Sequence, residues 1–442
     1  MKIERYLLIL TSAIFSLILL SGTYNCKAMA ITLEESIDLA LKNNHEIKKY
    51  RNISNAQKSR AASAWSDFLP KVDLGYDYDK HENFVAPLTE ESSTFAASAS
   101  INLFNGFRDY FSLKSSVSEY DAARYMARSV EADTILKVKG RYFSVLRSQD
   151  NVVVKKDAVS LLERQRKDAE LFYSSGLIAK NDLLKVEVEL ASARQELLSA
   201  EMGLNIALRE LEKSIGMKTE EGEVFESVEG PNELIFDEVS MVSLMGERRS
   251  ELRYMRSKLN AARYTARSER GGYLPSLDLS YTYYRFGEDD AFEGRPAPLF
   301  DDDERILLSA SWNLFDGFKT WNDMNAARYD AEAASEDLMN VEEELKLQLQ
   351  AALEEYKISF NMINVAQTAV DQANENYRIT ESQFKQRVAA TSDLLDARFI
   401  LSRAKSELNN ARFGLLLSIA KIERVIEVEN ISNFLKGQQV SQ

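Results

Sequence analysis

Four stretches of the chain alternate strictly between apolar and polar residues, and they form two pairs. The first pair covers residues 71–81 and 92–103, and the second covers residues 277–287 and 305–314 around an acidic loop, 288–304. Alternation with a period of two predicts β-strands with one apolar face. Each run is about ten residues long, and about 9–11 tilted residues cross a bilayer. The pattern predicts two β-hairpins, either membrane-spanning or soluble with one wet face.

Most of the remaining chain has helical periodicity. The runs 108–174 and 319–385 contain only helix-compatible residues, which predicts two helices on the order of 90–100 Å long. The apolar positions of the second run lie three or four residues apart: Leu338, Val341, Leu345, Leu349, Ala352, Tyr356, Phe360, Ile363, Ala366, Val370, Ala373 and Tyr377. An average spacing of about 3.5 is typical of a coiled-coil seam.

Shorter helices flank these elements. Residues 31–66 predict a helix, because Thr32 and Glu35 form a capping-box pattern at its start and Pro70 follows its end. Each long helix ends at a turn, and a return helix then runs to about Ile215 or Ile426.

The whole pattern occurs twice. Phe68-Leu69-Pro70 recurs 205 residues later as Tyr273-Leu274-Pro275, and residues 102–107, Asn-Leu-Phe-Asn-Gly-Phe, recur 211 residues later as Asn-Leu-Phe-Asp-Gly-Phe. A self-match of this length indicates internal duplication. We therefore predict five segments: a signal peptide (1–30), a first repeat (31–215), an acidic linker (216–236), a second repeat (237–430) and a loose C-terminal tail (431–442).

Composition narrows the possible functions. Lys2 and Arg5 precede the apolar run 6–20 and Ala28-Met29-Ala30, a pattern typical of a cleaved secretory signal. The net charge of −14 argues against a nucleic-acid partner. Two histidines and one cysteine leave little for zinc or thiol chemistry, so we expect no cofactor, no metal site and no enzyme. No later apolar run approaches 20 residues, so entry into a membrane would depend on the strands.

Four strands are too few to form a transmembrane barrel, because known barrels begin at about eight strands. If the strands enter lipid, several chains must share one barrel. Aromatic residues cluster where the strands meet the helices, either as a membrane-interface girdle or as a small core beneath the hairpins. These residues are Trp65, Phe68, Phe104, Phe107, Tyr273, Trp312, Phe315 and Phe318.

The order of these motifs resembles that of the TolC-like outer-membrane efflux family over essentially all of 31–430. The resemblance is carried by the Leu-Pro-x-x-x-Leu strand entries, the strand exits, the Asp-Leu-Leu turns and the helix starts at Asn44 and Arg249. It implies a mainly α fold with a β membrane portion, built from a duplicated helix-strand-strand-helix-helix unit. A homotrimer would share a 12-stranded barrel in outer-membrane lipid and continue it as a periplasmic α-barrel.

The resemblance also implies a function. The protein would be the exit duct of a tripartite efflux or type I secretion system, working with a periplasmic adaptor and an inner-membrane transporter. Asp393, Asp396 and Asp182 would line the periplasmic aperture, where rings of carboxylates favour cations. From the residues alone, Asp393 and Asp182 could simply occupy first helical turns, with Ser392 or Asn181 as cap. An exported coiled-coil structural or adhesin-like protein remains the alternative.

Overall fold

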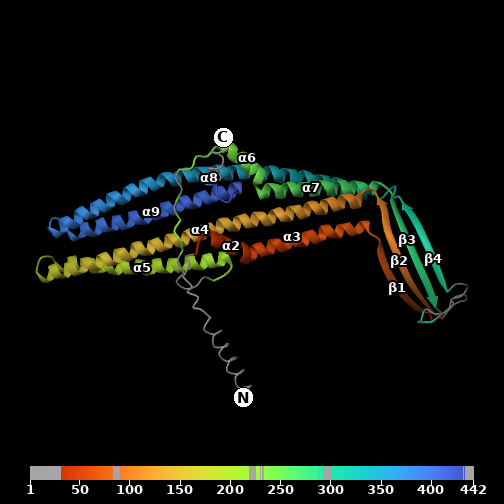
Figure 1. Ribbon diagram of the computed structural model, residues 1–442, viewed down its shortest axis with the longest axis horizontal. Helices are drawn as coiled ribbons and strands as arrows, with labels where there is room; N and C mark the ends of the chain where they lie inside the picture. Colours follow the sequence, from red (N-terminus) through yellow and green to blue (C-terminus); the bar gives the residue numbers. More distant parts are fainter. Residues whose placement is uncertain are drawn as a thin grey trace, which may run out of the picture.

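The computed structural model describes residues 31–82, 90–218, 225–228, 230, 233–287, 289–291, 301–431 and 433. The molecule is elongated, with a β-sheet at one end and long helices that run from the sheet to the opposite end (Figure 1). The fold is mainly α with a β portion, as predicted. The predicted signal peptide and most of the predicted tail lie outside the described residues.

One antiparallel sheet in the order β1-β2-β3-β4 unites the two hairpins. Its strands are β1 Lys71–Lys80, β2 Glu91–Asn105, β3 Ser276–Gly287 and β4 Asp302–Ser311. Tyr76 pairs with Phe95 in the first hairpin, and the residues 205 and 211 positions later, Tyr281 and Ile306, pair in the second. The two hairpins therefore have the same register.

The fourth strand differs from its prediction, because it ends at Ser311 rather than at residue 314. Ser311 pairs with Ser276, the first residue of β3, and Pro275 before it has no N–H to extend the ladder. β2 continues to Asn105 because it also pairs with the start of β3. Position in the sheet, rather than the alternating pattern, sets where β4 ends.

The two long helices have the predicted bounds: α4 is Arg108–Ser174 and α8 is Lys319–Lys385. After a turn, a second helix runs back alongside each long helix: α5 Lys180–Ile215 beside α4, and α9 Thr391–Ile426 beside α8 (Figure 1). At about 1.5 Å per residue, the 67 residues of each long helix span about 100 Å. No helix in the described part of the chain has an apolar stretch long enough to cross a membrane.

The prediction of one helix over 31–66 is wrong, because the chain breaks at Asn44 into α2 Leu33–Asn43 and α3 His45–Ser63. The side-chain Oδ1 of Asn44 accepts the N–H groups of Glu46 and Ile47, while its Nδ2 donates to the Ser214 carbonyl at 2.8 Å. One side chain therefore caps both the start of α3 and the end of α5. These two helices lie end to end alongside α4 (Figure 1). Thr32 caps α2 as predicted, accepting the Glu35 N–H at 3.0 Å.

The second repeat has the same break at Arg249, between α6 Glu238–Arg248 and α7 Ser250–Arg270. Short 3₁₀ helices, η1 Ala64–Phe68 and η2 Gly271–Tyr273, then lead into the strands.

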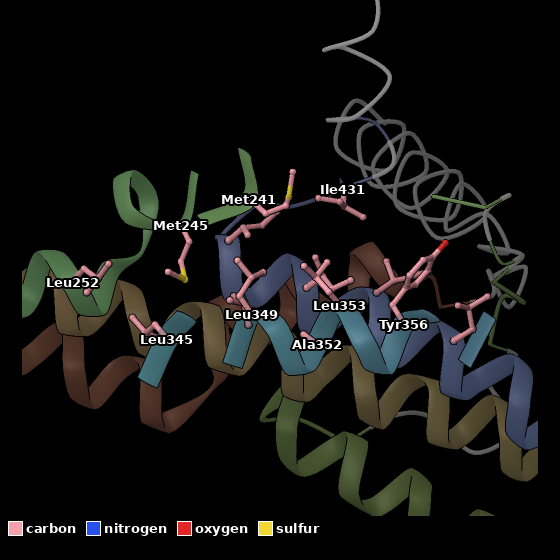
Figure 2. Close-up of a cluster of buried hydrophobic side chains, with 14 residues drawn as sticks. Met241, Met245, Leu252, Leu345, Leu349, Ala352, Leu353, Tyr356 and Ile431 are labelled. Carbon is pink, nitrogen blue, oxygen red and sulfur yellow. The ribbon is translucent and has the colours of Figure 1, made fainter. Parts of the chain in front are cut away.

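The main apolar core lies midway along the molecule, where α6 covers α8 and α9. The middle of the predicted seam of α8, from Leu345 to Tyr356, is buried there, and Met241 and Met245 of α6 pack against Leu345 and Leu349 (Figure 2). Fully burying one such side chain contributes about 1.5–3 kcal/mol. Ile431 belongs to the same core and is 0% exposed, although it begins the segment predicted as a loose tail.

Candidate functional site

The end farthest from the sheet is formed by two matched turns (Figure 1). Gly176 has φ +70° in the first turn, and Arg387 has φ +64° at the equivalent position of the second. Arginine therefore adopts here the left-handed conformation that normally favours glycine, and the backbone course is retained. The next residues, Leu177 and Val388, are exposed to 42% and 75%. Both turns thus present an apolar side chain at the tip.

Asp393 lies in the first turn of α9 and Asp396 in the second, directly after this tip, and both are exposed. Asp393 accepts the Ala390 N–H at 3.0 Å, so the cap residue is Ala390 and not Ser392. A carboxylate three residues into a helix offsets the positive end of the helix dipole. Asp396 has no ion-pair partner among the described residues. The two carboxylates, three positions apart, share one side of the helix.

Asp182 occupies the equivalent position in α5, but its surroundings differ. The cap residue is Ala179 rather than Asn181, and Asp182 pairs with Lys185 at 3.2 Å. The charge of this carboxylate is therefore partly compensated within its own helix. Asp393 and Asp396 therefore lack the kind of ion pair that partly neutralises Asp182.

The predicted interface aromatics gather at the junction of sheet and helices. Phe104 meets Phe107 at 5.2 Å between ring centroids, and Phe315 meets Phe318 at 5.4 Å, both edge to face. The Trp312 indole donates to the Tyr273 carbonyl at 3.1 Å. Seven of the eight aromatics are exposed in the single chain: Trp65, Phe68, Phe107, Tyr273, Trp312, Phe315 and Phe318. Their exposure does not fit a core beneath the hairpins, and a role at a membrane interface stays a prediction.

A buried ionic cluster at the middle of the molecule escaped the sequence analysis. Arg424 at the end of α9 is 6% exposed and pairs with Asp133 of α4 at 2.7 Å, and also with Glu251 of α7. Arg249 is 5% exposed and donates to the Arg424 carbonyl. Glu427 accepts the Ser250 N–H and hydroxyl at 2.9 and 2.7 Å.

Burial and mutual charge shift the pKa values in this cluster in opposite directions. Burial alone would raise the pKa of Glu251, but Arg249 and Arg424 together lower it. Burial raises the pKa of Glu427 and outweighs its hydrogen bonds from Ser250. The repeats offered a signal for this cluster, because Arg249 and Glu427 stand where the first copy has Asn44 and Gly216. No group of three or more metal-ligating side chains occurs within the described ranges.

Comparison with known proteins gives consistent matches over almost the whole chain. The sequence model of the family described as "Outer membrane efflux protein" matches residues 36–217 and 241–426. The outer membrane protein TolC of Vibrio cholerae is 24% identical over 414 residues, which cover 92% of each chain. The alkaline protease secretion protein AprF of Pseudomonas aeruginosa is 22% identical and covers 89% of this chain and 84% of its own.

The fold has solved counterparts as well. The Campylobacter jejuni CmeC outer membrane channel superposes with a TM-score of 0.79 at 18% identity, covering 92% of this chain and 88% of that chain.

Proposed function

Because the chain belongs to the outer membrane efflux protein family, we propose that it is the exit duct of a tripartite efflux or type I secretion system. The protein lies in the outer membrane and extends into the periplasm. It would passively conduct substrates from an inner-membrane transporter and a periplasmic adaptor to the outside. The observation that carries the proposal is the duplicated unit itself: two hairpins of membrane length joined to helices about 100 Å long.

The edges of the sheet support a homotrimer. The outer edges of β1 and β4 have no partner strand among the described residues. Unpaired backbone groups in lipid cost several kcal/mol each, so each edge requires a strand from another copy. Three copies would supply twelve strands and could close one barrel.

The repeat also specifies how neighbouring copies would pair. Ser98 of β2 pairs with Thr282 of β3 within the chain. The repeat equivalents of β2 and β3 are β4 and β1. If β4 pairs with β1 of the next copy in the same register, Ser309 lies opposite Asp77 of the partner subunit and Leu308 lies opposite Tyr78 of the partner subunit. Polar residues then face polar ones, and apolar residues face apolar ones, as a correct register requires.

Exposed apolar faces on the helices support the same arrangement. α5 exposes Val188, Leu198 and Met202, and α8 exposes Ile358, Met362 and Val365. Within the chain, α4 packs against α9, where Asn151 lies 3.5 Å from Ser406. Repeating that contact between copies brings α8 against α5 of the partner subunit, and it would cover both apolar faces.

The tip is the proposed aperture and docking end. In a trimer, Asp393 and Asp396 would contribute six carboxylates, which favour cations over anions. The exposed apolar residues Leu177 and Val388 lie at the same end, where an adaptor would dock.

The test is planar-bilayer recording of the purified, detergent-solubilised protein together with its oligomeric mass. We expect trimers that form cation-preferring channels. A monomer that is stable without detergent and forms no channel would contradict the proposal and favour an exported structural protein.

A further inference from the structure

A row of arginines follows one side of α7. Its members are spaced three, seven, four and three residues apart, which places them on one helix face. They are Arg253, Arg256, Arg263, Arg267 and Arg270. Arg253 is half-buried and the other four are exposed. Such a row is unexpected in a chain whose net charge is −14.

Acidic partners are missing from this row. Elsewhere on the long helices, exposed arginines pair with carboxylates three or four residues away, as Arg378 does with Glu375 at 2.7 Å and Arg166 with Glu170 at 3.7 Å. Within the described ranges, no arginine of the α7 row forms an ion pair, and Arg263 and Arg270 have no hydrogen-bond, ion-pair or aromatic-ring partner. The row therefore keeps its full positive charge.

The backbone contacts of the row show which side of the helix layer it occupies. Arg253 donates to the Glu247 carbonyl at 2.7 Å and Arg256 to the Gly246 carbonyl at 3.4 Å, both at the end of α6. The row therefore begins beside α6 and continues on that side toward the sheet.

The first repeat has a shorter basic row, in which Arg51 also forms an ion pair with Glu131 at 2.8 Å. Arg51 of α3 donates to the Leu41 carbonyl at the end of α2 at 3.1 Å. Lys48 and Lys58 stand at the positions that match Arg253 and Arg263, and both are exposed. If the protein is a duct, as proposed above, its centre must stay open, so the added layer of α2 and α6 lies outside. Both basic rows then face outward, between that layer and the membrane.

We propose that these rows bind the carboxylate-bearing polymer of the cell wall where it surrounds the duct. Guanidinium groups bind carboxylates through paired hydrogen bonds. Each α7 row runs about 25 Å along the duct, so a membrane surface would reach only its Arg270 end. Three copies would place six basic rows around the circumference, which suits a surrounding anionic meshwork better than a single docked protein.

The experiment is co-sedimentation of the full-length, detergent-solubilised protein with purified cell-wall sacculi at low and high salt. Arg263→Gln with Arg270→Gln removes two charges that have no hydrogen-bond, ion-pair or aromatic-ring partner within the described ranges, so folding should be unaffected. We expect the wild-type protein to bind sacculi at low salt and the variant to bind at least about tenfold more weakly. Each basic side chain near an anionic surface strengthens binding, and salt screens this attraction. Arg263→Lys with Arg270→Lys should retain most of the binding.

Arg166→Gln with Arg378→Gln is the matched control, because it removes the same charge from exposed sites elsewhere. Equal loss in both variants, absence of wild-type binding, or binding to anionic lipid vesicles alone would overturn the proposal. Conductance is recorded in parallel. If wild-type channels are absent, the duct function itself fails, whereas normal channels without sacculus binding reject only this inference.

Discussion

At the scale of single residues, the two repeats cap equivalent helix starts, those of α3 and α7, with different side chains. In the first, Asn44 caps the start of α3, and Gly216 adopts φ +82° where a Cβ would meet the Asn43 carbonyl at 2.9 Å. In the second, Glu427 takes the glycine position with φ +51°, and its carboxylate caps α7 through Ser250. The junction is therefore uncharged in the first repeat and charged in the second, while the backbone follows the same course in both.

Replacing Glu251 with glutamine should destabilise the second junction in a pH-dependent way. Removing one partner of a largely buried ionic cluster should lower the free energy of unfolding by about 2–4 kcal/mol at neutral pH. Because the pKa of Glu251 is below its ordinary 4.5, its contribution is fully present above that value and is lost as pH falls through the lowered pKa.

Unfolding in detergent, followed by circular dichroism at pH 7 and at acidic pH, measures this difference between wild type and variant. Glu332→Gln is the control, because its pair with Arg328 is exposed and should contribute less than about 0.5 kcal/mol. A difference that does not shrink toward acidic pH would contradict the assigned role of the carboxylate.

Neutralising the tip carboxylates tests the aperture directly. Asp393→Asn with Asp396→Asn should raise single-channel conductance and weaken block by multivalent cations, because the proposed ring of carboxylates would lose its charge. Asparagine at 393 can still accept the Ala390 N–H, so the helix start is retained. Asp182→Asn should have a smaller effect, since Lys185 already compensates that charge. Unchanged conductance and block in the double variant would remove these residues from the aperture.

At the scale of elements, the junction between sheet and helices depends on close backbone packing. A Cβ at Gly106, which has φ +71°, would lie 2.3 Å from the Gly271 carbonyl oxygen. Gly176 at the tip has nearly the same φ, +70°, but open space around it. Comparing substitutions at these two glycines therefore separates two destabilising effects: the strain of a positive φ, which both positions share, and the steric clash, which only Gly106 has.

Gly106→Ala should therefore destabilise the protein by clearly more than Gly176→Ala. The left-handed conformation alone costs alanine about 1–2 kcal/mol, whereas the contact at residue 106 also forces the two repeats apart. Thermal unfolding of both variants in the same detergent gives the comparison. Equal losses would mean that the junction tolerates a shift of the backbone.

The sequence was most informative for elements with long, continuous patterns. The seam of α8 predicted a helix whose bounds the structure confirms, because each apolar step keeps the same face buried. Periodicity missed the break at Asn44, where only the resemblance marks a helix start, since neither proline nor glycine stands there and the stabilising contact, to the Ser214 carbonyl, is tertiary. The pairing of Arg424 with Asp133 joins residues 291 positions apart, which periodicity cannot reveal.

At the scale of the whole molecule, the register of the predicted junction between copies can be tested by cross-linking. Ser309→Cys with Asp77→Cys should give disulfide-linked trimers in membranes under oxidation, because the transferred register places these residues opposite each other. Leu308→Cys with Asp77→Cys is the control, since neighbouring strand residues point to opposite faces. Cross-linking of the control pair instead would mean a register shifted by one residue.

Gly317 offers a second test at this scale. It has φ +69° and open space within one chain, although its counterpart Gly106 is tightly packed against the other repeat. Gly317→Ala should cost the folding of the single chain only the roughly 1–2 kcal/mol of the left-handed conformation, as Gly176→Ala does, but unlike Gly176→Ala it should also reduce the yield of trimers on native gels. Normal trimer yield would show that the junction between copies is looser than the one inside each chain.

The single sheet shared by both repeats has a consequence for biogenesis. In the proposed trimer, each chain would contribute one junction between repeats that forms when the chain folds, so a ring of six repeats would need only three junctions between chains. Two chains alone would still leave open strand edges facing lipid, which favours completion of the ring over intermediate species. Assembly should consequently be nearly all-or-none, with monomers and closed rings as the species present at equilibrium.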